Sequence, residues 1–182
     1  MITEDILLQI MPNLKSSQCE EYCQFLQQAM DEFEINKPLR EAAFLAQIAH
    51  ESGEFKYLEE IWGPTDAQKH YEPPSKKADD LGNKEPGDGK RFKGRGAIQL
   101  TGRGNYKKFG ELLDLDLITH PEWAADPQVA FRVSGAFWKS NGLNELADQQ
   151  QFEKITRRIN GGLNGQDERL KFYNRAKPLC GA

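Results

Sequence analysis

Apolar residues recur every three or four positions along most of this chain, the spacing of an amphipathic helix. Thr3 is placed to cap the first predicted helix, Ser16 or Ser17 to cap the second, and Pro38 suits the first turn of the third. The pattern predicts helices over residues 3–11, 16–33, 38–53, 105–113, 127–140, 151–159 and 167–179. The fold class that follows is mostly α.

Residues 63–96 break this pattern because they are rich in proline and glycine. We predict a long loop here with one or two short helical turns, one of them at about Thr65 to His70. Ala97 to Thr101 is expected to be a short strand or extended segment, so the β content is minor at most. A long irregular connection inside a compact domain is often a functional one.

Length and composition place the chain among ordinary globular proteins. Its 182 residues fit one domain with a core, or a domain with a smaller lobe. The net charge of −4 gives no overall attraction to nucleic acid or to an anionic membrane surface. No apolar run approaches the roughly 20 residues that span a bilayer, so we expect no stable membrane association.

The start of the chain and its cysteines indicate where the protein is made. Glu4 and Asp5 stand where a signal peptide needs positive charge, which predicts synthesis in the cytoplasm without a signal peptide. Cys19 and Cys23 lie one helical turn apart, a poor arrangement for a disulfide. We expect these two residues and Cys180 to be thiols, in agreement with a cytoplasmic origin.

Glu51 interrupts the apolar face of the third predicted helix. Phe44, Ile48 and Glu51 stand at i, i+4 and i+7, and seven residues are close to two full turns. Glutamate is rarely buried without a partner or a function, and burial disfavours its charged form. A carboxyl group that keeps its proton can act as a general acid. A structural ion pair, or a helix-end side chain that reaches water past Gly53, explains the position equally well.

A glycosidase needs a second carboxylate across the bond that it cuts. Glu54, Glu59 and Glu60 all follow closely, and their spacing alone does not distinguish them. Glu60 is followed by Ile61 and Trp62, and sugar sites combine aromatic faces with polar groups. We therefore favour Glu60 as the second carboxylate and Trp62 as a substrate-binding aromatic.

Two other kinds of site are set aside. His50-Glu51 begins like a zinc-protease motif, but position 54 is Glu where that motif requires a second His. His70 and His120 also lack the spacing of metal ligands, so we expect no metal and no other cofactor.

Residues 86–104 combine glycines with basic residues but lack both the phosphate-loop and the dinucleotide patterns. A nucleic-acid patch with Phe92 and Tyr106 as stacking groups, or a solvated charge run, leaves the glycines unexplained. Glycines let a backbone approach a ligand closely, so we interpret the segment as part of a substrate cleft and expect no nucleic acid partner.

Four segments together resemble glycoside hydrolase family 19, which contains chitinases and related peptidoglycan-cutting endolysins. They are FLAQIAHESGEF (44–55), GRGAIQLTGRGNY (94–106), INGGLNG (159–165) and DERLKFYNRA (167–176). Their order and spacing fit the short bacterial and phage-type members. The resemblance implies a lysozyme-like fold with two lobes around a central cleft. It also implies a single catalytic domain over residues 1–182, without a separate binding module.

The resemblance also implies roles for individual residues. Glu51 matches the general acid, Glu60 the general base of the short endolysin-type members, and Thr101 a hydroxyl that helps to hold the attacking water. The implied mechanism is inverting, with the two carboxyl groups about 6.5–9.5 Å apart to leave room for that water. The further substrate-binding candidates lie in the shared motifs: Gln99, Asn105, Tyr106, Asn160 and Arg169.

The disulfides and the longer insertion of plant chitinases are missing, which favours a peptidoglycan-degrading endolysin from a phage, prophage or phage-tail-like bacteriocin cluster. Such an enzyme is expected to act as a monomer on the cell wall after release, and the family's usual context implies a holin as partner. The alternatives are a chitinase acting on chitin oligomers, a lytic transglycosylase, and a carbohydrate-binding protein without turnover. Glu51, Glu60 and Thr101 together argue against the last of these.

Overall fold

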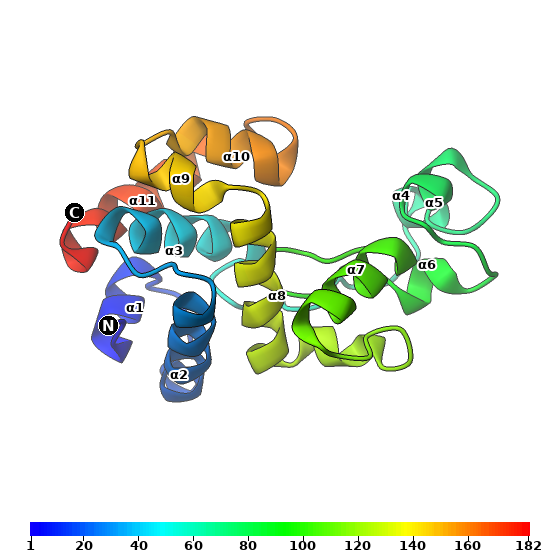
Figure 1. The fold of residues 1–182 in the computed structure, drawn as a ribbon, viewed down its shortest axis with the longest axis horizontal. Helices are drawn as coiled ribbons and strands as arrows, with labels where there is room; N and C mark the ends of the chain where they lie inside the picture. The colour runs from blue at the N-terminus through cyan, green and yellow to red at the C-terminus, as the bar shows by residue number, and fades with distance from the viewer.

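A computed structural model describes all residues, 1–182, and consists almost wholly of helices (Figure 1). The eleven α-helices and one 3-10 helix follow in this order: α1 (Glu4–Ile10), α2 (Ser16–Glu32), α3 (Pro38–Ser52), α4 (Asp66–Lys69), α5 (Lys76–Asp80), α6 (Asp88–Arg91), α7 (Arg103–Leu113), η1 (Pro121–Ala125), α8 (Pro127–Ser140), α9 (Leu143–Asp148), α10 (Phe152–Asn160) and α11 (Gln166–Cys180). The prediction of a mostly α fold is confirmed.

Most of the longer helices begin and end at the capping residues predicted from the sequence. The Thr3 side chain accepts a hydrogen bond from the Ile6 amide at the start of α1. Pro38 is the first residue of α3, and Gly53 follows its end with φ 58°. Ser16 differs, because it is the first residue of α2 and not its cap.

The segment between residues 63 and 96 contains three short helices, including the predicted turn after Thr65. Ala97 to Thr101 does not form a strand. The amide of each of Arg95 and Leu100 donates to the carbonyl of the other, at 3.0 and 2.7 Å, and the residues between them form a tight turn. The β content is therefore limited to isolated bridges, Arg95 with Leu100 and Glu59 with Arg95.

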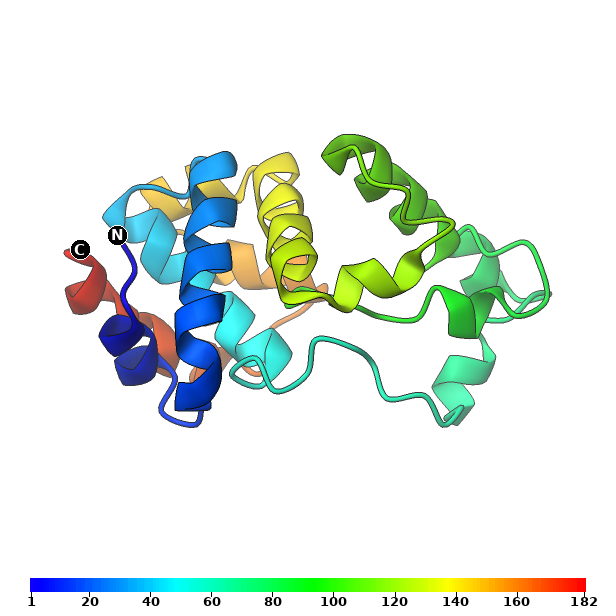
Figure 2. The same cartoon turned by 90° about the horizontal axis from the view of Figure 1, so that it is seen from below.

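The buried apolar residues form two cores, and each belongs to one lobe. The larger lobe, formed by α1–α3 and α8–α11, has a hydrophobic core of 32 buried residues. The smaller lobe, around α7, has a hydrophobic core of nine buried residues. α8 belongs to both, because Phe131 and Trp138 enter the first core and Val133 and Ala136 the second. Figure 2 shows α8 between the two lobes, with extended segments crossing from one lobe to the other.

Polar contacts stabilise the outer part of the smaller lobe, where few apolar side chains are buried. Asp88 accepts hydrogen bonds from the Lys84 and Glu85 amides at 2.8 and 3.1 Å, and from the Arg103 guanidinium at 2.8 and 2.7 Å. Burial alone would raise the pKa of Asp88, but these donors lower it to about 2.

Two further findings concern the whole chain. Cys19, Cys23 and Cys180 are free thiols. None of the helices combines the length and apolar character that crossing a membrane requires.

Candidate active site

α3 places Glu51 in its last turn, at the end of an apolar face. Phe44 and Ile48, on the same face, are fully buried, and the Glu51 side chain is 23% exposed. α3 packs along α11, and Arg169 of α11 brings Nη2 to 2.5 Å from Glu51 Oε1. The approach is an ion pair without the alignment of a hydrogen bond. Oε2 has no partner within the protein and remains available to a ligand.

Arg169 is fixed by a buried polar network. Its Nη1 donates to Gln47 Oε1 at 2.6 Å and its Nε to the Asn164 carbonyl at 3.0 Å. Gln47 in turn donates to the Thr156 hydroxyl at 2.8 Å, so α3, α10 and α11 are joined beside Glu51. Arg169 is 1% exposed, which makes it a residue that positions Glu51 and not a surface group that a sugar could cover.

Glu60 lies where the chain has crossed toward the smaller lobe, and its carboxylate is surrounded by donors. Oε1 accepts from Gln68 Nε2 at 3.0 Å, and Oε2 accepts from the Gly94 amide at 2.9 Å. Burial first, and then the charge and hydrogen bond of Glu60, raise the pKa of Tyr71. The two donors therefore hold both oxygens of the Glu60 carboxylate in place.

Glu59 has different partners from its neighbour. Its carboxylate pairs with Lys93 at 3.1 Å and with Arg95 at 3.0 Å. Burial alone would raise the pKa of Glu59, but hydrogen bonds from Lys93 and Arg95 lower it below its ordinary value. Glu59 therefore serves to tie the crossing segment to the turn at residues 95–100.

The motif that contains Gly94 brings Gln99 close to Glu60 and also carries Thr101. A side chain at Gly94 would meet Gln99 Oε1 at 2.6 Å and Glu60 Oε2 at 3.2 Å, so only glycine leaves room for both. The carbonyl of half-buried Thr101 accepts from Asn105 Nδ2 at 2.8 Å. The Thr101 hydroxyl has no partner within the protein.

Tyr106 requires a correction, because its ring is fully buried in the smaller core. Its hydroxyl donates to the Lys93 carbonyl at 2.6 Å and accepts from Arg95 at 2.9 Å. Burial first raises the pKa of Tyr106, to about 12. Tyr106 therefore supports the loop from within and offers no face to a sugar.

The two remaining substrate-binding candidates, Trp62 and Asn160, have features of residues that contact a ligand. Trp62 is half-buried, with its ring centroid 6.2 Å from that of Tyr71. Asn160 ends α10, and its Nδ2 is buried without a hydrogen-bond partner. Buried donors are rarely left unpaired, so this amide is placed to receive a ligand acceptor.

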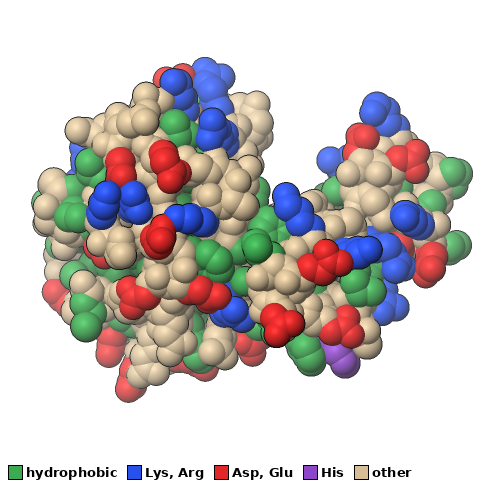
Figure 3. Space-filling model, in the orientation of Figure 1, with side chains coloured by type: hydrophobic (Ala, Val, Ile, Leu, Met, Phe, Trp, Pro, Cys, Tyr) green, Lys and Arg blue, Asp and Glu red, His purple; other side chains and the backbone are tan.

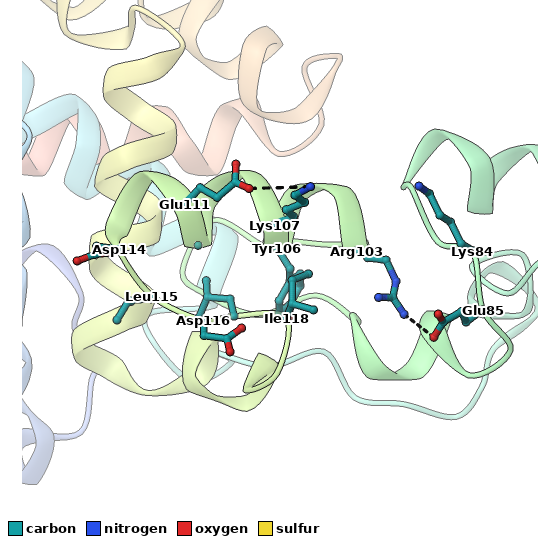
Figure 4. Close-up of a pocket in the computed structure, with 12 residues that line it drawn as sticks. Lys84, Glu85, Arg103, Tyr106, Lys107, Glu111, Asp114, Leu115, Asp116 and Ile118 are labelled. Atoms are coloured by element: carbon teal, nitrogen blue, oxygen red, sulfur yellow. Dashed lines mark hydrogen bonds and ion pairs between the residues drawn. The ribbon is translucent and has the colours of Figure 1, made fainter.

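A broad hollow separates the two lobes in Figure 3, and α3 ends at the junction of the lobes (Figure 1). A separate cavity of about 850 Å³ lies along α7 and residues 114–118, and Tyr106 is the only predicted site residue that borders it (Figure 4). Two pairs of its charged residues form ion pairs, Arg103 with Glu85 at 2.9 Å and Lys107 with Glu111 at 4.0 Å. This cavity is therefore separate from the predicted catalytic residues Glu51, Glu60 and Thr101.

Sequence reasoning missed Gln47, Gln68 and Tyr71. Gln68 is the N3 residue of a capping box whose N-cap is Thr65, and this pattern is visible in the sequence. Its contact with Glu60 is not visible, because that contact depends on how the loop folds back. Gln47 stands within an apolar helix and carries no signal beyond being a polar residue there.

The sequence matches the protein-family model described as chitinase class I over residues 20–148. It is 36% identical over 162 residues to a glycosyl hydrolase family 19 domain-containing protein of Haemophilus influenzae, covering 76% of this chain and 78% of that protein. It is 41% identical over 154 residues to an endochitinase of Arabidopsis thaliana, covering 80% of this chain and 50% of the plant protein. The chain thus spans about half the length of the plant relative.

Solved structures show the same fold. Chitinase C of Streptomyces griseus aligns with a TM-score of 0.76 at 24% identity, covering 100% of this chain and 93% of that one. A second bacterial family 19 chitinase aligns with a TM-score of 0.78 at 24% identity, covering 100% and 95%. Fold and sequence together define a chitinase-like glycoside hydrolase. The chain belongs to glycoside hydrolase family 19, as the four motifs predicted.

Proposed function

We propose that this protein cleaves β-1,4 bonds between aminosugars in peptidoglycan, as an endolysin-type enzyme. The observation that carries the proposal is that two carboxylates are each held in a fixed position: Glu51 pairs with buried Arg169 through one oxygen, and Glu60 accepts from Gln68 and from the Gly94 amide. The preference for peptidoglycan rests on the free thiols and on the lack of the longer insertion between the two glutamates that plant chitinases of this family carry.

In the proposed mechanism, Glu51 protonates the leaving oxygen through Oε2, and Arg169 holds the other oxygen in place. Glu60 accepts a proton from a water molecule that the Thr101 hydroxyl helps to hold. That water attacks the anomeric carbon from the opposite face, which inverts its configuration. Asn160, Gln99, Asn105 and Trp62 bind the sugars on either side. Residues 1–182 act as one catalytic unit and as a monomer, which reaches the wall through a holin-type partner.

Chitin oligomers are the second candidate substrate. The endochitinase and chitinase names of its relatives favour this alternative. Both polymers are β-1,4 chains of N-acetylated aminosugars, so the same carboxylate chemistry serves both. The stem peptides of peptidoglycan are the chemical difference that an assay can detect.

One experiment separates the candidates. The purified protein is incubated with purified peptidoglycan, permeabilised Gram-negative cells and soluble chitin oligomers, and the products are identified by mass spectrometry. We expect new reducing ends on peptidoglycan, and inversion at the anomeric carbon by NMR. Turnover of chitin alone would replace the substrate assignment, and anhydro-muramyl ends would replace hydrolysis by transglycosylation.

Glu51→Gln tests the proton donor. The amide keeps the shape of the side chain but has no acidic proton, so we expect activity to fall by at least about a hundredfold. The melting temperature should remain near that of the wild type. Retention of most of the activity would remove Glu51 from the mechanism.

A further inference from the structure

α3 is followed by an unusual turn in which three successive residues have positive φ: Gly53 at 58°, Glu54 at 58° and Phe55 at 64°. Glycine adopts this conformation readily, whereas Glu and Phe do so rarely because their Cβ crowds the backbone. The turn lies between Glu51 and Glu60 in the chain. Backbone of this kind persists only where the surroundings hold it in place.

Contacts of Phe55 and Ser52 fix one side of the turn. The Phe55 ring is 2% exposed and makes edge contacts with Tyr22 and Phe131, at centroid distances of 5.8 and 5.0 Å. Its amide donates to Ser52 Oγ at 2.9 Å, and that hydroxyl donates to the Ile48 carbonyl at 2.6 Å. These contacts anchor the far end of the turn in the larger core.

Hydrogen bonds of the Glu54 side chain fix the other side of the turn. Its Oε2 accepts from the Asn13 main-chain amide at 2.6 Å, and its Oε1 accepts from Asn13 Nδ2 at 2.8 Å. Asn13 lies between α1 and α2, so this two-bond clamp joins the turn to a segment 41 residues away. A glutamate thus occupies a position whose local geometry favours glycine, and both of its carboxylate oxygens are used.

We propose that Glu54 is a positioning residue, and that its clamp to Asn13 fixes the turn that sets Glu51 relative to Glu60. The proposal rests on the proposed function for the roles of these two carboxylates. The Tyr57 amide donates to the Ser52 carbonyl at 2.9 Å and the Glu60 amide to the Gly94 carbonyl at 2.7 Å. The first of these bonds ties the start of the segment that carries Glu60 to the end of α3, and the second fixes its far end, so the turn sets the spacing between the two carboxylates.

Glu54→Gly separates positioning from stability, because glycine removes the clamp and also the cost of positive φ. We expect kcat to fall about tenfold to a hundredfold, since small misplacements of catalytic groups have effects of this size. KM should stay within about twofold and the melting temperature near that of the wild type. Asn13→Ala, which keeps Glu54, its positive φ and the main-chain bond and removes only the Nδ2 bond, should show a smaller loss of kcat and a lower melting temperature.

Glu153→Gln is the matched control, because it removes an exposed carboxylate that pairs with Arg157 on α10. It should leave kcat unchanged. A wild-type kcat in Glu54→Gly would overturn the proposal.

Amide hydrogen exchange, read by mass spectrometry over residues 52–60, tests the clamp without any substrate. Glu54→Gly should exchange at least about tenfold faster there and at the wild-type rate in α11. Unchanged exchange over residues 52–60 would overturn the clamp. If the wild type turned over no aminosugar polymer, the proposed function would fail, and exchange alone would still decide whether the clamp holds the turn.

Discussion

Glu59 and Glu60 show how two adjacent residues of one type acquire different roles from their partners. Glu59 pairs with two cations, Lys93 and Arg95, and its side chain is 44% exposed. Glu60 receives neutral donors, the Gln68 amide and the Gly94 main-chain N–H. The cations give Glu59 a structural role in salt bridges, whereas the neutral donors hold the Glu60 carboxylate in place without a salt bridge.

Substituting these two residues tests the assignment of the base. We expect Glu60→Gln to lower kcat by at least about a hundredfold, because the amide cannot accept a proton from water. Glu59→Gln keeps an oxygen that can accept from Arg95 and loses only the charge of a half-exposed side chain, so activity should remain within about threefold of the wild type. Steady-state kinetics on the better substrate provide the measurement. A larger loss in Glu59→Gln than in Glu60→Gln would exchange their roles.

Individual site residues could be predicted where the signal was local. Glu51 stood out because a carboxylate interrupted an apolar helical face, and the structure places it beside Arg169. Tyr106 was wrongly predicted to bind substrate, since a tyrosine in a glycine-rich motif has the same sequence signal whether its ring faces a cleft or a core. Gln68 was missed because its contact with Glu60 depends on the path of a loop.

At the scale of elements, the long helices could be predicted because two or more turns give a recognisable period. α5, α6 and α9 have four to six residues, too few for such a period, and were missed. Residues 97–101 were wrongly predicted to be extended, because an apolar run does not show that the chain reverses there. The tight turn follows from hydrogen bonds between Arg95 and Leu100.

The start of α11 contains a contact that no sequence pattern reveals. A side chain at Gly165, where φ is 72°, would lie 2.2 Å from His50 Cε1. His50 also pairs with Glu168 of α11. The end of α3 that carries Glu51 therefore packs against the start of α11. The close approach explains why glycine occupies position 165.

Gly165→Ala should therefore disturb both stability and catalysis. The added methyl forces His50 to move, and we expect a destabilisation of about 1–3 kcal/mol with a lower kcat. Gly87→Ala is the control, because its φ of 93° is also positive but nothing lies within 4 Å of the added methyl. Thermal unfolding and steady-state kinetics measure both variants. An equal effect of the two would assign the loss to backbone strain and not to the His50 contact.

At the scale of the molecule, the two lobes are stabilised differently. The larger lobe rests on a 32-residue apolar core, whereas the smaller has nine buried apolar residues and relies on polar contacts such as those of Asp88. The two-lobed arrangement was expected from the family resemblance. The spacing of apolar residues alone could not predict the two lobes. α8 contributes to both cores, and only the packing of the helices shows which residues belong to which core.

This difference predicts a pH-dependent weakness of the smaller lobe. The pKa of Asp88 is about 2 in the folded protein, below its ordinary value of 3.8. The unfolded chain therefore takes up a proton first as pH falls, so the stabilisation by Asp88 is complete above pH 3.8 and is lost as pH falls through about 2. The shift corresponds to about 2 kcal/mol at neutral pH.

Asp88→Asn should therefore destabilise the protein by about 2 kcal/mol at pH 7 and hardly at all near pH 2, where the wild type has lost the same contribution. Asp80→Asn is the control, because Asp80 is exposed and its distance to Lys76 is 3.4 Å. Urea unfolding between pH 2 and pH 7 provides the measurement, with hydrogen exchange in α6 and α7 locating the effect. A loss of stability independent of pH would show that Asp88 acts through packing and not through its charge.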